Sequence, residues 1–536
     1  MVDFKSSPLD LFGGEVIGVG FNRILIMKKA VCILFVLCLK IGSAVASKDS
    51  YRDFVVEEPL ASGEKSKAIN GIKPNILFIL LDDFGWRDAG FMGSDFYETP
   101  VIDQLASESV VFTNAYAAAA NCAPSRASLL SGQYSPRHEI YNVGTKPRGS
   151  AACRRLEHIS GKEFLDAESD TWANVAQKAG YVTGMIGKWH LSEDPLDYGF
   201  SFNLGGDHRG SPPEGYYSPH VDAPGLGEAP EGEYITDRLN DEALKFIERN
   251  KGKSWLLYLS HFAVHTPLDA KKELLDKYRE KTPGELHSHV NMATMVECLD
   301  QGIGRILDGI SRLGLDENTI IIFSSDNGGF GPATDMYPLR GYKGTYYEGG
   351  IRVPLVVKWP GVGRSGIRVD NPVTGVDLYP TLCDMMRHDL PADQVIDGRS
   401  LRPLLEGSEV ERVEQPLFWH FPAYLQSYSG VFDEQRDPLF RSRPCSIVRL
   451  GDWKLHYYYE DQEMLLFNLK MDIGENENVA GTFPGKASKL KRLLDDWISV
   501  TEAAVPVAKN PLFDAEAERL AIEKFTKGSI ATDQLR

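Results

Sequence analysis

The segment Asn75-Ile76-Leu77-Phe78-Ile79-Leu80-Leu81-Asp82-Asp83 decides the fold class of this chain. Its apolar run is not interrupted by polar residues, which is typical of a strand buried on both faces of a parallel sheet. Two carboxylates follow the run directly. Because ligands of open α/β sheets bind at the carboxyl ends of strands, we expect a binding site at the end of this strand.

Further apolar runs and helical patterns alternate along the chain. Strands are predicted over Tyr181–Ile186, Trp255–Ser260, Thr319–Ser324 and Pro354–Lys358. Helices are predicted over Val101–Phe112, Thr171–Lys178, Glu233–Arg249, Met292–Leu313 and Leu378–Met386. Such alternation predicts an α/β fold, with a large, mostly parallel central sheet sandwiched by helices. The segment 200–232, rich in Gly and Pro, is predicted to be a long surface loop.

The pattern changes after about residue 410. Short strands are predicted over Leu417–His420, Ser446–Leu450, Lys454–Tyr458 and Leu465–Leu469, followed by a helix over Lys486–Ser499. This suits a smaller C-terminal antiparallel sheet packed by one helix. We therefore expect a catalytic domain over 73–408, a small α+β subdomain over 409–505 and a polar tail over 506–536.

The N-terminal region has the features of an export signal. Lys28 and Lys29 precede the apolar run Ala30–Leu39, and Ala44-Val45-Ala46 offers small residues for cleavage. The run is too short to span a membrane. We expect an upstream extension over 1–26, a signal peptide over 27–46 and a linker over 47–72. The protein would then be periplasmic or secreted, with a bacterial source favoured.

Composition is ordinary for a globular protein: the 536 residues are 43% hydrophobic and 25% charged, with a formal net charge of -17. This charge argues against a nucleic-acid partner. An anionic substrate would need a local basic pocket. Apart from Cys122 and the two cysteines of the signal, Cys153, Cys298, Cys383 and Cys445 show no metal-cluster spacing. An export compartment permits disulfides, but spacing does not give their pairing.

Two strand ends carry hard oxygen ligands. Asp82 and Asp83 repel one another and need a cation nearby, and Asp326-Asn327 repeats the arrangement after the strand Thr319–Ser324. Together they supply hard oxygen ligands for Ca²⁺ or Mg²⁺. Taken singly, the first pair could be a solvated strand end and the second an Asx-Gly turn.

The segment Cys122-Ala123-Pro124-Ser125-Arg126 leads into a predicted helix. Pro124 suits the first helical turn, which places Cys122 at or just before the helix N-terminus, where free N–H groups favour an anion. Arg126, one turn on, offers a planar fork to an oxyanion. A buried structural cysteine before a capped helix is the alternative.

Further candidates follow other strands. Lys188 and His190 lie in Gly187-Lys188-Trp189-His190, and His265 follows the strand Trp255–Ser260. We expect His261 to be a packing or hydrogen-bonded residue rather than a site residue. Lys343 lies in the glycine-rich segment 340–350, which could bring it close to a substrate oxygen or could simply be a mobile loop.

From residue 73 to about residue 500, these segments occur in the order found in the sulfatases, which the chain resembles within the alkaline phosphatase superfamily. The resemblance implies that Cys122 is oxidised to formylglycine by a separate formylglycine-generating enzyme. It implies a metal, usually Ca²⁺, held by Asp82, Asp83, Asp326 and Asn327, to which residue 122 adds an oxygen as formylglycine.

The catalytic residues implied by the resemblance are Arg126 and Lys188 around the formylglycine hydrate, and His190, His265 and Lys343 at the sulfate. Similarity to the arylsulfatase and N-acetylgalactosamine-6-sulfatase branch implies a sulfated saccharide as substrate. A formylglycine-dependent phosphodiesterase or phosphonate monoester hydrolase is the second candidate, and a non-catalytic binding protein is the third. His208, Arg209, His220 and His420 are candidates for substrate choice or for solvated loop positions.

Overall fold

The computed structural model describes residues 73–220, 222–227, 229–407, 415–428 and 436–533. The predicted extension, signal peptide and linker lie outside the described residues. Everything described belongs to one compact unit, Ser50–Arg536. Within this described part, no helix has the length and apolar character that a membrane crossing needs.

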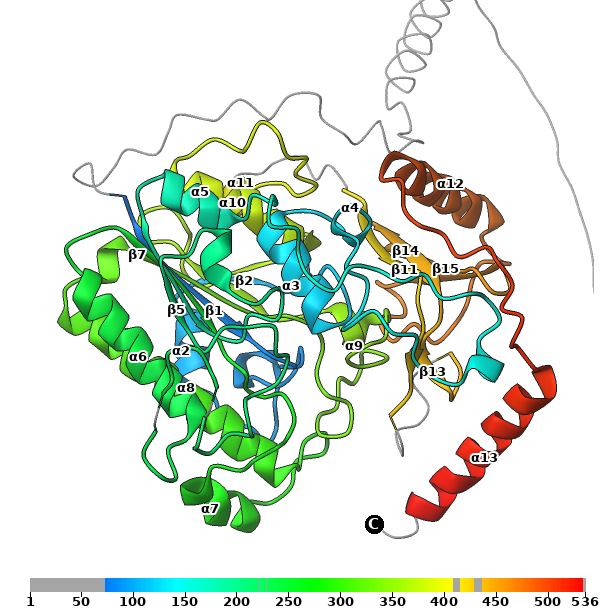
Figure 1. Ribbon diagram of the computed structural model, residues 1–536, viewed down its shortest axis with the longest axis horizontal. Coiled ribbons are helices and arrows are strands. Elements are labelled where there is room, and N and C mark those ends of the chain that lie inside the picture. Colours follow the sequence, from blue (N-terminus) through cyan, green and yellow to red (C-terminus); the bar gives the residue numbers. More distant parts are fainter. Residues whose placement is uncertain (1–72, 221, 228, 408–414, 429–435, 534–536) are drawn as a thin grey trace, which may run out of the picture. The chain divides into compact units, whose positions relative to one another are not determined.

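A large sheet forms the centre of the fold (Figure 1). Its strands, in spatial order, are β5 (Phe202–Leu204), β4 (Val182–Gly187), β6 (Trp255–Ser260), β1 (Asn75–Leu81), β7 (Thr319–Ser325), β8 (Leu355–Lys358), β2 (Val110–Phe112) and β9 (Ile367–Val369). The first five are parallel to one another, and β8 runs antiparallel to both of its neighbours. The predicted mostly parallel sheet is therefore confirmed.

Helices cover both faces of this sheet, as Figure 1 shows for α6 and α8 on one side and α3, α5 and α10 on the other. The helices described between residues 73 and 407 are α2 (Pro100–Ser107), α3 (Cys122–Ser131), α4 (Ser135–His138), α5 (Trp172–Lys178), α6 (Ile235–Asn250), α7 (Leu275–Glu280), α8 (Val290–Arg312), α9 (Glu348–Ile351), α10 (Leu378–Met386) and α11 (Arg402–Leu405). Short 3-10 turns are η2 (Gly90–Met92), η3 (Ala151–Cys153), η4 (Pro195–Tyr198), η5 (Lys272–Leu274), η6 (Asp316–Asn318) and η7 (Gly375–Asp377).

Strand β1 shows why its sequence is apolar throughout. Leu77 and Ile79 pack with α6 and α8, whereas Ile76 and Phe78 pack with α3 and α5 on the other face. A strand that contributes to two cores cannot alternate polar and apolar residues. This double burial holds the carboxyl end of β1, and thus Asp82, in a fixed place.

The C-terminal part is a second, smaller layer. Its antiparallel sheet has the order β11 (Leu417–Phe421), β14 (Cys445–Leu450), β15 (Trp453–Tyr458) and β16 (Glu463–Asn468), and α12 (Pro484–Val500) packs on it through Leu490, Leu494 and Trp497. Two-stranded pairs are formed by β3 (Ala115–Tyr116) with β10 (Val373–Thr374), and by β12 (Leu425–Gln426) with β13 (Phe440–Ser442). The predicted antiparallel sheet with one helix is confirmed.

Three segments differ from the prediction. The helix predicted over Val101–Phe112 ends at Ser107, because Val110–Phe112 is a β-branched and aromatic run that pairs with β8 and β9. The predicted loop 200–232 contains the edge strand β5. The tail contains a helix that was not predicted, α13 (Ala515–Asp533), which is fixed by an ion pair of 2.9 Å between Glu518 and Arg443.

Candidate active site

Four neighbouring parallel strands, β4, β6, β1 and β7, end at one edge of the sheet. Lys188 follows β4, His265 lies in the loop after β6, Asp82 and Asp83 follow β1, and Asp326 follows β7. Because the strands are parallel and adjacent, side chains that are distant in sequence meet here. The site predicted at the end of the first strand therefore lies at a shared edge.

The first ion pair of the site joins Asp82 to Lys188. Lys188 Nζ lies 2.6 Å from Asp82 Oδ2, and neither side chain is exposed. Burial raises the pKa of Asp82 to about 8, against the lowering effect of Lys188, and the nearby charge of Asp326 adds to the rise. One lysine thus does not balance the carboxylates gathered here.

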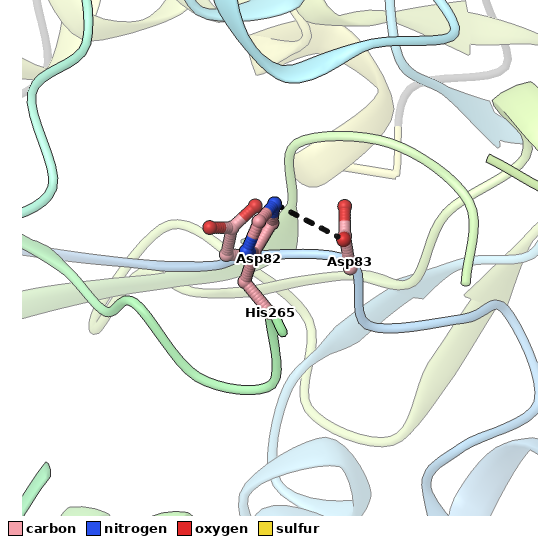
Figure 2. Close-up of side chains that lie close together, drawn as sticks. All are labelled: Asp82, Asp83 and His265. Atoms are coloured by element: carbon pink, nitrogen blue, oxygen red, sulfur yellow. Dashed lines mark ion pairs between the residues drawn. The ribbon is translucent and has the colours of Figure 1, made fainter. Parts of the chain in front are cut away.

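Asp83 is the most heavily contacted carboxylate. Lys343 Nζ lies 2.7 Å from its Oδ2, and Asn327 Nδ2 donates to its Oδ1 at 2.8 Å. Figure 2 shows His265 reaching toward the same side chain, with 3.8 Å between His265 Nε2 and Asp83 Oδ2. Burial raises the pKa of Asp83, but the charge and hydrogen bond of Lys343, with the charge of Lys188, outweigh this effect and hold the pKa below its ordinary value.

Cys122 is the first residue of α3, as predicted, and it is buried. One turn later, Arg126 Nε pairs with Asp326 Oδ2 at 2.9 Å, and its Nη1 donates to Lys188 O and to Ser260 Oγ. Its Nη2 is buried without a hydrogen-bond partner. Arg126 therefore joins the helix of Cys122 to the strand ends and keeps one donor free.

The site histidines are neutral at pH 7 in the ligand-free protein. Burial, with Lys343 next, lowers the pKa of His265 to about 3. Burial, together with Lys188 and Arg126, lowers the pKa of His190 well below its ordinary value. His190 has a left-handed backbone (φ 66°), and its Nδ1 has no hydrogen-bond partner. Both rings are placed to take up a proton when negative charge arrives.

The carboxylate and amide oxygens of the site fit a hard divalent cation. One ligand atom each from Asp82, Cys122 and Asp326 lies within 4.8 Å of the others, and Asp82, Asp83 and His265 form a second such group. Asp82 Oδ1 and Asn327 Oδ1 are buried oxygens without a hydrogen-bond partner. A buried carboxylate oxygen left unpaired is costly unless a cation binds it.

The structure brings all of the predicted site residues together. The contact of Ser260 with Arg126 was missed, although its place at the end of an apolar strand on the same edge was a usable signal. His261 is buried, as expected of a packing residue, but it is not hydrogen-bonded, because neither ring nitrogen has a partner. The cysteines of the described part, at 122, 153, 298, 383 and 445, are all free and buried.

The candidates for substrate choice separate into two groups. Asp207 O accepts from His190 N at 2.8 Å, so the segment of His208 and Arg209 adjoins the site. Arg209 is paired with Asp207, and His208 Nδ1 lies 2.8 Å from Glu193 Oε2. His220 and His420 are buried, and the ring of His420 bonds Ser446 Oγ and Ala504 O in the C-terminal part.

Comparison with known proteins decides the family. The family model described as Sulfatase matches residues 74–388, and the model described as N-sulphoglucosamine sulphohydrolase, C-terminal, matches residues 342–499. The chain belongs to the sulfatase family. A sulfatase of Formosa agariphila is 32% identical over 548 residues, which cover 88% of this chain and 97% of that protein. Human arylsulfatase D is 31% identical over 473 residues, covering 72% of this sulfatase and 77% of the human protein.

Solved structures agree. The structure of Ps i-CgsB in complex with k-i-k-neocarrahexaose is 27% identical to this sulfatase, covers 85% of it and 98% of its own chain, and has a TM-score of 0.66. The phosphonate monoester hydrolase of Agrobacterium radiobacter, 22% identical over 80% of this chain and 96% of its own, has a TM-score of 0.56 and shares the fold alone. The sulfatase is thus a sulfuric ester hydrolase with the alkaline-phosphatase-like fold.

Proposed function

We propose that this sulfatase removes sulfate from a sulfated saccharide, with residue 122 as the nucleophile after its oxidation to formylglycine. The observation that carries the proposal is the position of Cys122 at the N-terminus of α3, among Asp82, Asp326 and Arg126. The saccharide is inferred from the oligosaccharide bound by Ps i-CgsB. A formylglycine-generating enzyme is the partner that this maturation needs.

Each group supplies a distinct chemistry. Hydrated formylglycine offers a hydroxyl that attacks sulfur and a second hydroxyl whose collapse to the aldehyde releases sulfate, which serine or cysteine cannot do. A bound Ca²⁺ or Mg²⁺ would be held by Asp82, Asp83, Asp326, Asn327 and residue 122, and would act as a Lewis acid toward the sulfate oxygens.

The chain's own residues divide the remaining work. Arg126 keeps its free Nη2, and Lys188 its charge, for the oxyanions that develop. His265 would protonate the leaving alcohol, since a sulfate bound beside it offsets the charge of Lys343 and favours the protonated ring. His190, neutral before the reaction, would take the proton from the second hydroxyl.

Sulfate release from a panel of sulfated saccharides and an aryl sulfate tests this function. The protein is co-produced with a formylglycine-generating enzyme, and mass spectrometry of the peptide that holds residue 122 verifies the oxidation. We expect release by the wild type and none by Cys122→Ala. Hydrolysis of phosphate diesters or phosphonates in place of sulfate esters, by protein with verified formylglycine, would refute the sulfated substrate.

Export is part of the same proposal. The basic, apolar and small-residue segments at 27–46 support a periplasmic or secreted enzyme. Fractionation of cells that express the full chain tests it, with deletion of residues 27–46 as the control. Activity that stays in the cytoplasm with the full chain would contradict export.

A further inference from the structure

The backbone N–H and C=O groups of Lys343 and Gly344 all make hydrogen bonds. Lys343 N donates to Gly329 O at 2.9 Å, and Gly344 N donates to Ala120 O at 2.8 Å. Both acceptors belong to the part of the chain that carries the site. The two carbonyl oxygens are bound from elsewhere, by residues about one hundred positions farther along.

Those two donors come from β13 in the C-terminal part. Arg441 Nη1 donates to Lys343 O at 3.1 Å, and Ser442 Oγ donates to Gly344 O at 2.7 Å. Ala120 lies two residues before Cys122, so this peptide links the nucleophile's segment to the C-terminal part.

The guanidinium of Arg441 is itself held rigidly. Its Nε donates to Gln426 O on β12 at 2.9 Å, and its Cζ lies 3.7 Å from the centre of the Tyr428 ring. The residue is 8% exposed, and it makes no ion pair among the residues that the structure describes. Its bonded N–H groups are thus directed at carbonyl oxygens. The contact with Lys343 therefore fixes the backbone in place and does not neutralise a charge.

Gly344 allows this close approach. Its φ is +90°, and a Cβ there would lie 2.6 Å from Leu425 Cδ2 and 2.9 Å from Arg441 Nη1. A side chain at 344 would therefore separate the peptide from Arg441. The sequence around Lys343 is built to accept the arginine.

We infer that Arg441 is a positioning residue for the reaction, acting through Lys343. The inference rests on the proposed function and on the place at the sulfate that the resemblance to sulfatases implies for Lys343. By holding Lys343 O, Arg441 sets where the lysine side chain starts, and the ammonium then reaches Asp83 at 2.7 Å. A displacement of about 1 Å in a catalytic group can lower turnover by about 100-fold.

Steady-state kinetics of the matured enzyme on an aryl sulfate tests the inference. We expect Arg441→Gln to lower kcat by about 10- to 100-fold with little change in KM, since the lost contact serves the reacting geometry. Arg441→Lys should recover part of kcat, because its amine reaches Lys343 O but cannot also hold Gln426 O. Equal kcat in Arg441→Gln and the wild type would overturn the inference.

Arg443→Gln is the matched control. Arg443 lies two residues on and is 5% exposed, and it pairs with Asp437, Glu460 and Glu518 away from Lys343. Its loss should lower stability at least as much as the loss of Arg441 while leaving kcat of the folded enzyme unchanged. An equal fall in kcat in both variants would mean a general structural effect, and would overturn the inference.

A double variant separates positioning from any independent effect. If Arg441 acts through Lys343, adding Arg441→Gln to Lys343→Ala should lower the residual kcat no further. A full additional fall would overturn the positioning role. Wild-type kcat in Lys343→Ala would also overturn it, while sulfate release by the wild type would still support the proposed function.

Discussion

Asp83 shows how single residues of the site are constrained. One of its oxygens accepts from Lys343 and the other from Asn327, so both are engaged before any cation binds. Asp82 differs, because only its Oδ2 is paired and its Oδ1 is buried without a partner. Asp82 is therefore the carboxylate with the most to gain from a cation.

We predict that Asp82→Asn abolishes stabilisation by Ca²⁺. A cation that binds only the folded protein adds about 2.7 kcal/mol at one hundred times its Kd. After a chelator has removed bound metal, addition of Ca²⁺ should restore this stabilisation in the wild type. It should not do so in Asp82→Asn. Urea unfolding with and without Ca²⁺ measures it, and the unmodified Cys122 protein suffices.

The control for this prediction is Asp300→Asn. Asp300 is a buried carboxylate that accepts from the backbone N–H groups of Val101 and Ile102 at the start of α2. It should lower stability without removing the response to Ca²⁺. A full response in Asp82→Asn would contradict the metal site built from these residues.

At the scale of elements, the sequence predicted those strands and helices that bury one or both of their faces, because burial requires apolar residues there. The β6 and α10 bounds match the predictions, because each element is a mostly apolar run that is buried almost throughout. The boundary between α2 and β2 was not predicted, because apolar residues continue from the helix into the strand. Helix α13 was not predicted either, because the contact that fixes it joins Glu518 to Arg443, which lies 75 residues earlier in the chain.

The residues of the site also fall into those that the sequence predicted and those that it did not. Residues that directly follow a strand, such as Asp82 and Asp326, could be predicted because parallel strands bring their ends to one edge. Arg441 could not, because it reaches Lys343 from a different layer of the fold and no local pattern marks it. Motif order identified the family, whereas the contacts that position its groups needed the structure.

Helix α4 carries a pH-dependent contact with α3. His138 Nε2 lies 2.9 Å from Ser128 Oγ, its Nδ1 accepts from Ile140 N, and burial lowers its pKa to about 3. Since the folded pKa is below the unfolded value of about 6.5, this stability is present above pH 6.5 and is lost as pH falls toward 3.

We predict that His138→Gln removes about 2 kcal/mol of the loss in unfolding free energy between pH 7 and pH 5. Urea unfolding of both proteins at the two pH values measures it. Ser128→Ala is the matched control: it removes the hydroxyl but keeps the titrating ring, so it should retain the wild-type pH dependence. An unchanged pH dependence in His138→Gln would show that the ring accepts a proton without unfolding.

At the scale of the whole molecule, a buried charged cluster joins the α9 segment to the C-terminal sheet. Lys454 Nζ on β15 lies 3.0 Å from Glu348 Oε1 and 3.0 Å from Glu475 Oε1, and none of the three side chains is exposed. Glu475 Oε2 also accepts from Glu348 N at 2.6 Å. Because Glu348 lies five residues after Lys343, this cluster and Arg441 hold the same segment from the same layer.

We predict that Lys454→Met lowers the free energy of unfolding by about 3–5 kcal/mol, because it leaves two buried carboxylates without their shared cation. The double variant Lys454→Met/Glu475→Gln should be more stable than Lys454→Met alone, since one uncompensated charge is then removed and Glu348 keeps Arg352 and Tyr116. Urea unfolding of the single and double variants measures both effects. If the second substitution only adds to the first loss, the cluster acts through packing instead of charge, and the carboxylates would have to be protonated in the folded protein.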